Sequence, residues 1–256
     1  MSARRRVFVA VVAALVLLGL VTVAVALRGS QPTAAPVAQD RLGPVLLVPG
    51  YGGSATALDR LAAVLRAAGR EATVVRLPGD GTGPLADQAA VLAAAADAAL
   101  AAGAPSVDVV GYSAGGVVAR LWVAEDGGAG RARRVVTLGS PHHGTEIAAL
   151  ASVLAPDSCP PACQELAPDS PLLGRLNRGD ETPSGPLWVS IRTTDDQVVT
   201  PSSSADLEGA LDLVVQDVCP GRQVAHGQLP TDTAVQSLVL DALRVTRPKA
   251  PAACPG

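Results

Sequence analysis

The stretch VDVVGYSAGGVVARL, residues 107–121, joins an apolar, β-branched run to a helical pattern through a corner rich in glycine. Val107–Val110 has the composition of a buried strand, and the residues after the corner continue as a helix. Gly111 and Gly115 flank a single serine, Ser113. At so sharp a corner, a Cβ at either glycine would collide with neighbouring backbone. The pattern therefore predicts a strand, a tight turn and a helix, with Ser113 at the apex.

The same alternation extends along the chain on both sides of this corner. Aliphatic runs predict strands at 45–48, 73–77, 107–110, 135–138, 187–192 and 211–218. Helical segments are expected at 57–68, 84–102, 115–125, 146–154 and 232–245. Strands that alternate with helices predict a parallel sheet covered on both faces. We therefore expect one catalytic α/β domain over residues 44–247, preceded by a linker at 29–43 and followed by a tail at 248–256. Within the domain, 155–185 has the composition of an irregular excursion over the strand ends.

Composition and charge exclude one class of function. Apolar residues make up 48% of the chain, which is ample for a core, but aromatic residues make up only 2%. The formal net charge is −3, and the arginines are scattered beyond the first few residues. Nucleic-acid binding needs a basic stripe or aromatic stacking platforms. Since neither is present, we expect no nucleic-acid partner.

The N-terminal sequence predicts an export signal or a membrane anchor, and its lack of a polar face disfavours the alternative of a buried core helix. Arg4-Arg5-Arg6 precedes 21 uncharged residues, Val7–Leu27. A helix of that length rises about 30 Å at about 1.5 Å per residue, enough to cross a hydrocarbon core. Ala24-Val25-Ala26 offers a cleavage site, so a signal peptide and an uncleaved anchor both remain open for residues 1–28. The arginines keep the N-terminus inside. We therefore expect an extracellular or cell-envelope protein, with any membrane contact made through residues 7–27.

Four cysteines agree with an oxidising compartment. They allow three pairings, of which we favour Cys159 with Cys163 and Cys219 with Cys254, because the second would pin the C-terminal tail. A zinc site is the competing interpretation. The paired C-x₂-C spacing of such sites is missing, so we expect no metal and no cofactor.

The histidines decide what Ser113 could do. A serine hydroxyl needs a base to become nucleophilic, and the base needs an acid that fixes its tautomer. In a parallel α/β architecture of this kind the chain order is serine, acid, histidine. His226, in VAHGQLP, is the histidine that can satisfy this order. His142 and His143, in GSPHHGT, precede every plausible acid, and we interpret them as residues that shape or line a site, with a metal pair as the weaker alternative.

Two aspartates compete for the role of acid, and two backbone groups are candidates for an oxyanion hole. TTDDQVVTP places Asp195 and Asp196 just past a predicted strand, and chain geometry alone leaves the choice open. An oxyanion hole needs two backbone N–H groups aimed at the developing charge. We expect these from Ala114, directly after Ser113, and from Tyr51 in the glycine-rich loop VPGYGGS. The spacing of that loop does not fit a phosphate-binding motif.

With these residues in this order, the chain from about 44 to 247 resembles the α/β-hydrolase superfamily, and more narrowly the small secreted bacterial lipases and esterases of the triacylglycerol lipase type. LLVPGYGGS is similar to their hGxGG oxyanion loop, GYSAGG to GHSxGG, and GSPHHGT to a PHHGT segment. In those lipases the acid directly precedes a short x-V-V run, as in DQVV, which favours Asp196. HGQL places His226 in the H-x-x-L setting of the base. Pro49 and Tyr112 stand where the family often has histidine.

The resemblance implies an α/β-hydrolase fold with a minimal six-stranded, mostly parallel sheet. It also implies hydrolysis of carboxylic esters of lipids through an acyl-enzyme. The site residues would be Ser113, Asp196 and His226, with Tyr51 and Ala114 in the oxyanion hole. We expect a monomer whose partner is a lipid or acyl-ester substrate. An acyltransferase, a thioesterase or an envelope glycolipid deacylase with the same residues is the alternative. A binding protein that has lost catalysis would lack one of the three, and none is missing.

Overall fold

The computed structural model describes Arg5 and residues 37–255. The chain divides into two units, Met1–Ala34 and Ala35–Gly256, and the account below concerns the second. The apolar run at 7–27 and most of the expected linker lie outside the described residues. Among the residues that are described, no helix has both the length and the apolar character needed to cross a membrane.

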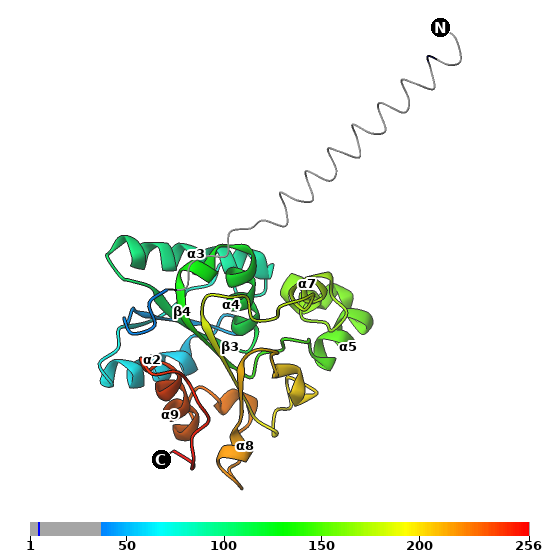
Figure 1. Cartoon of the computed structure of the whole chain (residues 1–256). Helices are drawn as coiled ribbons and strands as arrows, with labels where there is room; N and C mark the ends of the chain where they lie inside the picture. Colours follow the sequence, from blue (N-terminus) through cyan, green and yellow to red (C-terminus); the bar gives the residue numbers. More distant parts are fainter. Residues whose placement is uncertain (1–4, 6–36, 256) are drawn as a thin grey trace. The chain divides into compact units, whose positions relative to one another are not determined.

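Six strands form one sheet in the order β2-β1-β3-β4-β5-β6 (Figure 1). The strands are β1 (Val45–Val48), β2 (Ala72–Val74), β3 (Val107–Tyr112), β4 (Ala132–Leu138), β5 (Leu187–Arg192) and β6 (Leu211–Val214). Every pairing between neighbours is parallel, which confirms the predicted α/β fold class. The carboxyl ends of all six strands therefore meet at one edge, with β3 and its C-terminal corner near the centre.

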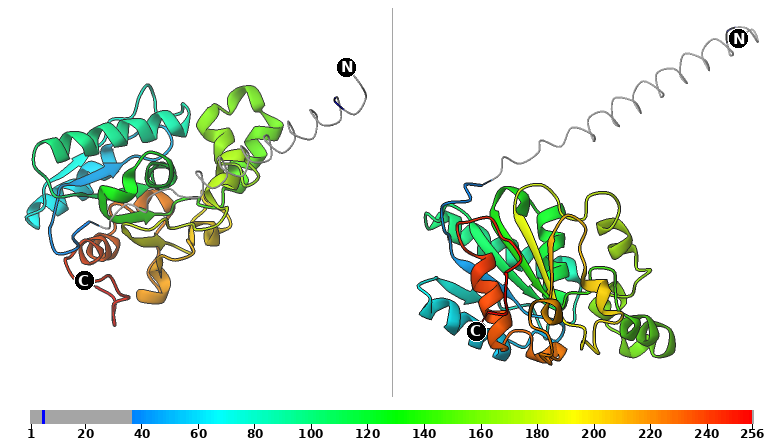
Figure 2. Two further views of the ribbon diagram at one scale, coloured as in Figure 1. Left: turned by 45° about the horizontal axis from the view of Figure 1, so that its top comes forward. Right: turned by 60° about the horizontal axis from the view of Figure 1, so that its bottom comes forward.

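Helices cover both faces of the sheet. They are α2 (Thr56–Ala67), α3 (Leu85–Ala101), α4 (Ala114–Glu125), α5 (Glu146–Leu154), α6 (Pro161–Glu165), α7 (Pro171–Leu176), α8 (Val215–Val218) and α9 (Thr233–Ala242). Short 3-10 turns lie at Gly128–Gly130, Pro156–Ser158, Ser202–Ala205 and His226–Gln228. Helices α3 and α4 lie on one face, and α2 and α9 on the other (Figures 1 and 2).

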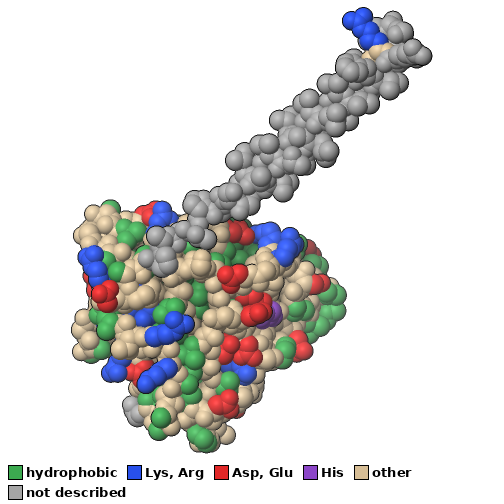
Figure 3. Space-filling view, in the orientation of Figure 1, with side chains coloured by type: hydrophobic (Ala, Val, Ile, Leu, Met, Phe, Trp, Pro, Cys, Tyr) green, Lys and Arg blue, Asp and Glu red, His purple; other side chains and the backbone are tan. Residues whose placement is uncertain are grey.

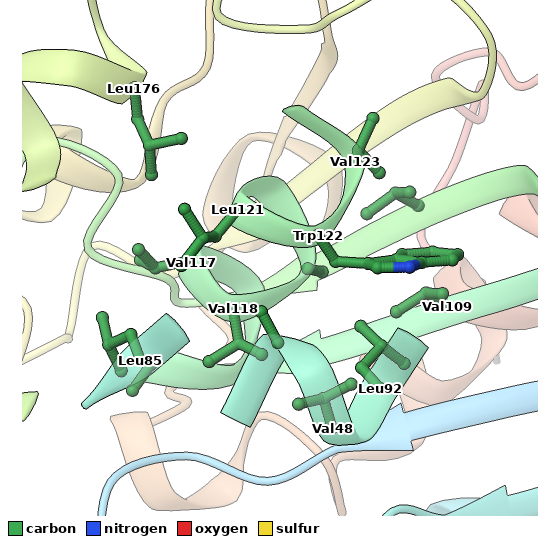
Figure 4. Packing of buried hydrophobic residues seen from close by; sticks show 14 of the residues in the cluster. Val48, Leu85, Leu92, Val109, Val117, Val118, Leu121, Trp122, Val123 and Leu176 are labelled. Carbon is green, nitrogen blue, oxygen red and sulfur yellow. The ribbon is translucent and has the colours of Figure 1, made fainter. Parts of the chain in front are cut away.

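The core follows the alternation of the strands. In β1, Leu46 and Val48 pack on the α3 and α4 side, whereas Val45 and Leu47 pack on the α2 and α9 side. Such a period of two is what a strand buried on both faces requires. On the first side, Trp122 of α4 is fully buried among aliphatic side chains (Figure 4). Helix α4, which begins at the Ser113 corner, is therefore held firmly by the core.

Several expected elements need correction. The strand expected at 73–77 ends at Val74, and the strand expected at 135–138 begins at Ala132. The expected strand at 211–218 is a strand only to Val214, and the next four residues form the helical turn α8. Strand β6 pairs only with β5, which ends at Arg192 opposite Val214, so no partner remains for residues beyond it. The stretch 155–185 is also less irregular than expected, because it contains α6 and α7. Each of these helices has proline at its first position, where a missing N–H costs nothing.

The disulfides are those that the sequence favoured. Cys159 is bonded to Cys163, and Cys219 to Cys254. The second bond closes a loop of 35 residues and joins the C-terminal tail to the residue after α8. The Cys219–Cys254 bond therefore attaches the C-terminal tail to the domain, as expected.

A buried ion cluster lies near the amino-terminal ends of the strands, whereas Ser113 lies at their carboxyl-terminal ends. Asp108 of β3 accepts hydrogen bonds from Arg70 at 2.6 Å and from Arg133 at 2.5 Å. Arg133 also donates to the carbonyl oxygen of Leu243, at the C-terminal end of α9, at 2.7 Å. Positive charge at the carbonyl end of a helix is stabilising. The cluster therefore fixes α9, the helix that follows the loop of His226.

Candidate active site

Ser113 occupies a strained corner between β3 and α4. Its backbone dihedral angles are φ 53° and ψ −127°, and it is the only non-glycine residue with positive φ in the described part of the chain. A Cβ at Gly111 would lie 2.5 Å from the Cα of Gly116. A Cβ at Gly115 would lie 2.2 Å from the carbonyl oxygen of Val48. Both positions therefore require glycine, for the steric reason that the sequence predicts.

The structure brings three of the predicted side chains into one hydrogen-bonded row. His226 Nε2 lies 3.0 Å from the Oγ of Ser113, and His226 Nδ1 lies 2.7 Å from Oδ2 of Asp196. The exposed fractions of Ser113, His226 and Asp196 are 9%, 7% and 7%. The second carboxylate oxygen, Oδ1 of Asp196, accepts the N–H groups of Val198 and Val199, both at 2.8 Å. The loop backbone thus fixes the carboxylate, and the carboxylate orients the imidazole.

Asp195 has a different set of partners. Its Oδ2 accepts the N–H of Val224 at 3.0 Å and the side-chain amide of Gln216 at 3.1 Å. Val224 lies two residues before His226. Asp195 therefore holds the segment that carries the imidazole, and Asp196 is the aspartate that contacts the ring.

Tyr112 supports His226 from β3. The two ring centroids are 5.2 Å apart, and the Tyr112 hydroxyl donates to the carbonyl oxygen of His226 at 3.3 Å. Burial raises the pKa of Tyr112 to about 12, and the charge of Asp196 adds to the effect. The phenol therefore stays neutral and remains a donor to the backbone of His226.

Gly139 is a site residue that none of the sequence motifs indicates. It follows β4 with φ 53°, and a Cβ there would lie 3.1 Å from Asp196 Oδ2, 3.2 Å from His226 Nδ1 and 2.6 Å from a methyl group of Leu229. Both the positive φ and the close contacts exclude a side chain. The available signal was a glycine directly after the predicted strand at 135–138, at the sheet edge where Ser113 was expected.

The loop after β1 lies against the Ser113 corner. A Cβ on Gly50 would lie 2.9 Å from the Cβ of Ser113 and 3.5 Å from its Oγ. Tyr51 follows Gly50 in this loop, and Ala114 is the first residue of α4. Within residues 37–255, neither the Tyr51 nor the Ala114 backbone N–H donates a hydrogen bond. Two backbone donors without acceptors thus come from the residues that the sequence indicated.

His142 and His143 lie outside the hydrogen-bonded row. His142 is fully buried, and its Nε2 lies 3.1 Å from Oγ1 of Thr137. His143 contacts Glu181 instead, with Nε2 2.9 Å from Oε1. The described residues contain no group of three or more histidine, cysteine or acidic side chains placed to hold a metal ion. His142 therefore belongs to the buried packing, whereas His143 is exposed and pairs with Glu181.

The buried His142 makes stability depend on pH. Burial holds the pKa of His142 well below its ordinary 6.5, and the positive charge of Arg120 and the neighbouring His143 lower it further. Protonation would also place an N–H on Nδ1, which has no hydrogen-bond partner among the described residues. Folded His142 therefore stays neutral at pH values where the unfolded chain takes up a proton.

We expect this difference to destabilise the protein in acid. Because the folded pKa is depressed, the contribution to stability is present above about pH 6.5 and is lost as the pH falls. Between about pH 7.5 and pH 5 protonation of the unfolded chain sets an upper limit of about 2 kcal/mol on this loss. Urea unfolding of the wild type and of His142→Gln at both pH values would measure it. The stability difference between the two proteins should shrink by up to that amount in acid, and a constant difference would contradict the assignment.

An apolar cavity opens beside Ser113. Its volume is about 270 Å³, slightly below the roughly 300–1,000 Å³ of sites that take drug-sized ligands. Three larger hollows in the described part of the chain are not lined by Ser113. The cavity is lined by Tyr51, Ser113, Pro141, Thr145, Ile147, Ala148, Ala151, Ser158, Cys163, Leu166, Val198 and Val199. Ser113 therefore faces a small space suited to an apolar group.

Helix α5, at the rim of this cavity, exposes an apolar face. Ile147, Leu150, Val153 and Leu154 are exposed, the last two at 76% and 72%. Figure 3 shows hydrophobic side chains gathered over the position that α5 occupies in Figure 1. Contiguous exposed apolar surface is uncommon on soluble proteins and marks contact sites.

The fold and the arrangement around Ser113 define an α/β hydrolase. The sequence profile of the Alpha/beta hydrolase family matches residues 45–250. The chain therefore belongs to that family, as the resemblance of its motifs predicts. No curated protein matches the sequence.

Solved structures with the same fold include lipases and esterases. Lipase B of Aspergillus fumigatus superposes with a TM-score of 0.71 at 20% identity, over 82% of this chain and 54% of that one. The mature form of lipase BlEst2 from Bacillus licheniformis gives 0.66 at 18% identity, over 84% and 96%. The metagenomic carboxyl esterase MGS0156 gives 0.51 at 19% identity, over 72% and 65%. This chain spans about half the length of the Aspergillus lipase, and at these identities the likeness concerns the fold.

Proposed function

We propose that this protein is a serine hydrolase that cleaves carboxylic esters of lipids. The observation that carries the proposal is the continuous hydrogen-bonded row from Ser113 through His226 to Asp196, beside an apolar cavity. In this proposal Ser113 is the nucleophile, His226 the base and Asp196 the acid. The lipase and esterase names of the structural neighbours agree with it.

The reaction would proceed through an acyl-enzyme. Ser113 Oγ attacks the ester carbonyl carbon while His226 Nε2 takes its proton, and Asp196 stabilises the imidazolium that results. The backbone N–H groups of Ala114 and Tyr51 donate to the oxyanion of the tetrahedral intermediate. The intermediate then collapses, and the alcohol leaves with the proton from His226. Water attacks the acyl group in the same way, which releases the carboxylic acid and restores Ser113.

The surroundings of Ser113 support an apolar acyl group. The cavity wall is mostly aliphatic, and the exposed face of α5 continues this apolar surface to the outside. Burial of apolar area contributes about 25 cal/mol per Å², so an acyl chain would bind here in preference to a charged group. The substrate class we propose is therefore a lipid or acyl ester.

The place of action we propose is the extracellular space or the cell envelope. The disulfides Cys159–Cys163 and Cys219–Cys254 support it, because such bonds persist in oxidising compartments. The arginine cluster and the apolar segment at 7–27 belong to the same proposal. The catalytic domain would act as a monomer.

A series of p-nitrophenyl esters tests the function directly. We expect hydrolysis of acetate through laurate esters by the full chain, and complete loss of activity after treatment with a fluorophosphonate. The same assays with an added alcohol measure transfer of the acyl group. Transfer that outruns hydrolysis would replace the lipase assignment with an acyltransferase, and activity confined to thioesters would replace it with a thioesterase.

A further inference from the structure

The outer wall of the cavity is built from two weakly attached pieces. Helix α5 buries only one of its nine residues, Ala148. Its N-terminal end is held, because Glu146 N–H donates to the carbonyl oxygen of Thr200 at 3.0 Å. At its other end, Val153 and Leu154 lie in solvent. The C-terminal half of α5 therefore depends on its contacts with the segment that follows it and with α6.

That next segment, Pro156–Ser158 and the adjoining Cys159, makes mostly local hydrogen bonds. Ser158 N–H donates to Ala155 at 2.9 Å and Cys159 N–H donates to Pro156 at 3.2 Å. One hydrogen bond reaches further along the sequence: the side-chain amide of Gln164 donates to the carbonyl oxygen of Cys159 at 2.7 Å. Ser158 nevertheless lines the cavity.

Helix α6, in contrast, is firmly docked on the body of the protein. Ala162 N–H donates to the carbonyl oxygen of Thr82 at 3.1 Å. The carboxylate of Glu165 accepts the N–H of Leu85 at 2.7 Å, at the start of α3, where negative charge is favoured. Cys163 lies between these two anchors and lines the cavity. The Cys159–Cys163 disulfide is thus a covalent cross-link, in addition to the backbone, between the wall and the docked helix.

We propose that the Cys159–Cys163 disulfide determines the acyl-chain specificity of the enzyme by holding the wall formed by the C-terminal half of α5 and residues 155–159 against the cavity. The inference rests on the proposed ester hydrolysis and deepens it. With the bond intact, the cavity keeps its volume of about 270 Å³ and accepts long acyl chains less readily than short ones. Without the bond, the wall moves outward and the preference for short chains weakens.

The test compares two variants that each lose one disulfide. Cys159→Ser with Cys163→Ser should raise the ratio of kcat/KM for laurate over butyrate esters about tenfold, since one methylene in an apolar pocket is already worth 10-fold or more. The control, Cys219→Ser with Cys254→Ser, removes a bond that does not line the cavity. Its ratio should stay within about twofold of the wild type.

The control separates specificity from stability. The Cys219–Cys254 bond closes a loop of 35 residues and Cys159–Cys163 a separation of four, and longer loops contribute more to stability. The control should therefore show the larger fall in Tm and the smaller change in specificity. Equal ratios in the two variants, or a change only in the control, would overturn the proposal.

A substitution that fills part of the cavity tests the same proposal independently. Ala151 lines the cavity on α5, so Ala151→Leu should lower the laurate-to-butyrate ratio in the wild type. In the Cys159→Ser, Cys163→Ser background the added side chain should cost less, because the wall can yield. Additive effects of the two changes would contradict a shared wall.

Inactivation rates distinguish failure of this inference from failure of the function. Alkyl fluorophosphonates of short and long chain report on the cavity through Ser113 alone, without turnover of an ester. If esters are not hydrolysed but the long-chain probe reacts faster in the Cys159→Ser, Cys163→Ser variant, the proposed function fails and the control of specificity stands. If no probe labels Ser113, both fail.

Discussion

Replacement of Ser113 by alanine is expected to abolish covalent labelling by fluorophosphonates and to lower kcat for esters by a factor on the order of 10⁶. Alanine removes the oxygen that lies 3.0 Å from His226 Nε2 and leaves no other nucleophile at the apex of the corner. Alanine at φ 53° is as strained as serine. The fold should therefore be retained, as circular dichroism and Tm would verify.

Ser184→Ala is the matched control for this variant. Ser184 is exposed, lies between α7 and β5 and does not line the cavity. It should keep both labelling and activity. Labelling that persists in Ser113→Ala would overturn the assignment of the site.

Asp196→Asn should lower kcat by about 10⁴-fold while substrate binding changes little. The amide still accepts hydrogen bonds from Val198 and Val199 through its oxygen. Its NH₂ group then faces His226 Nδ1, which selects the wrong imidazole tautomer and leaves the imidazolium without a counter-charge. Steady-state kinetics of the purified variant measure the loss.

Asp195→Asn removes the same charge from the neighbouring residue and so serves as the control for Asp196→Asn. Asp195 accepts from Val224 and Gln216 and does not contact the imidazole, so its replacement should cost about tenfold or less in kcat and lower the Tm modestly. If Asp195→Asn proved the more damaging of the two changes, the acid would have to be reassigned.

Apolar strand residues could be predicted from the sequence, whereas charged residues within a strand could not. The run at 187–192 matches β5 in full. Strand β4 begins three residues earlier than expected, because Arg133 and Arg134 lie within it. Arginine is rarely buried, so these two residues resemble a loop. They are buried because Asp108 and the last carbonyls of α9 satisfy the guanidinium groups, and those partners come from distant parts of the sequence.

The same reasoning separates the parts of the site that were predictable from those that were not. The glycine-flanked corner between strand and helix indicated Ser113, chain order selected His226, and the family resemblance favoured Asp196, which lies against the imidazole. The roles of Gly139 and Tyr112 depend on which strands lie side by side. Gly139 follows β4, and it faces Asp196 and His226 only because β4 lies between β3 and β5. A linear reading of the chain lacks this information.

The hydrogen bond between Ser113 and His226 joins residues 113 positions apart, and this distance sets when the site can form. Ser113 leaves the ribosome with β3, but His226 follows only after β5 and β6. Contacts so far apart in sequence form late in folding. A nascent chain, or a fragment cut before residue 226, therefore carries the serine without its base. Activity would appear only with the finished chain, so a cell that makes this protein meets no working hydrolase during its synthesis.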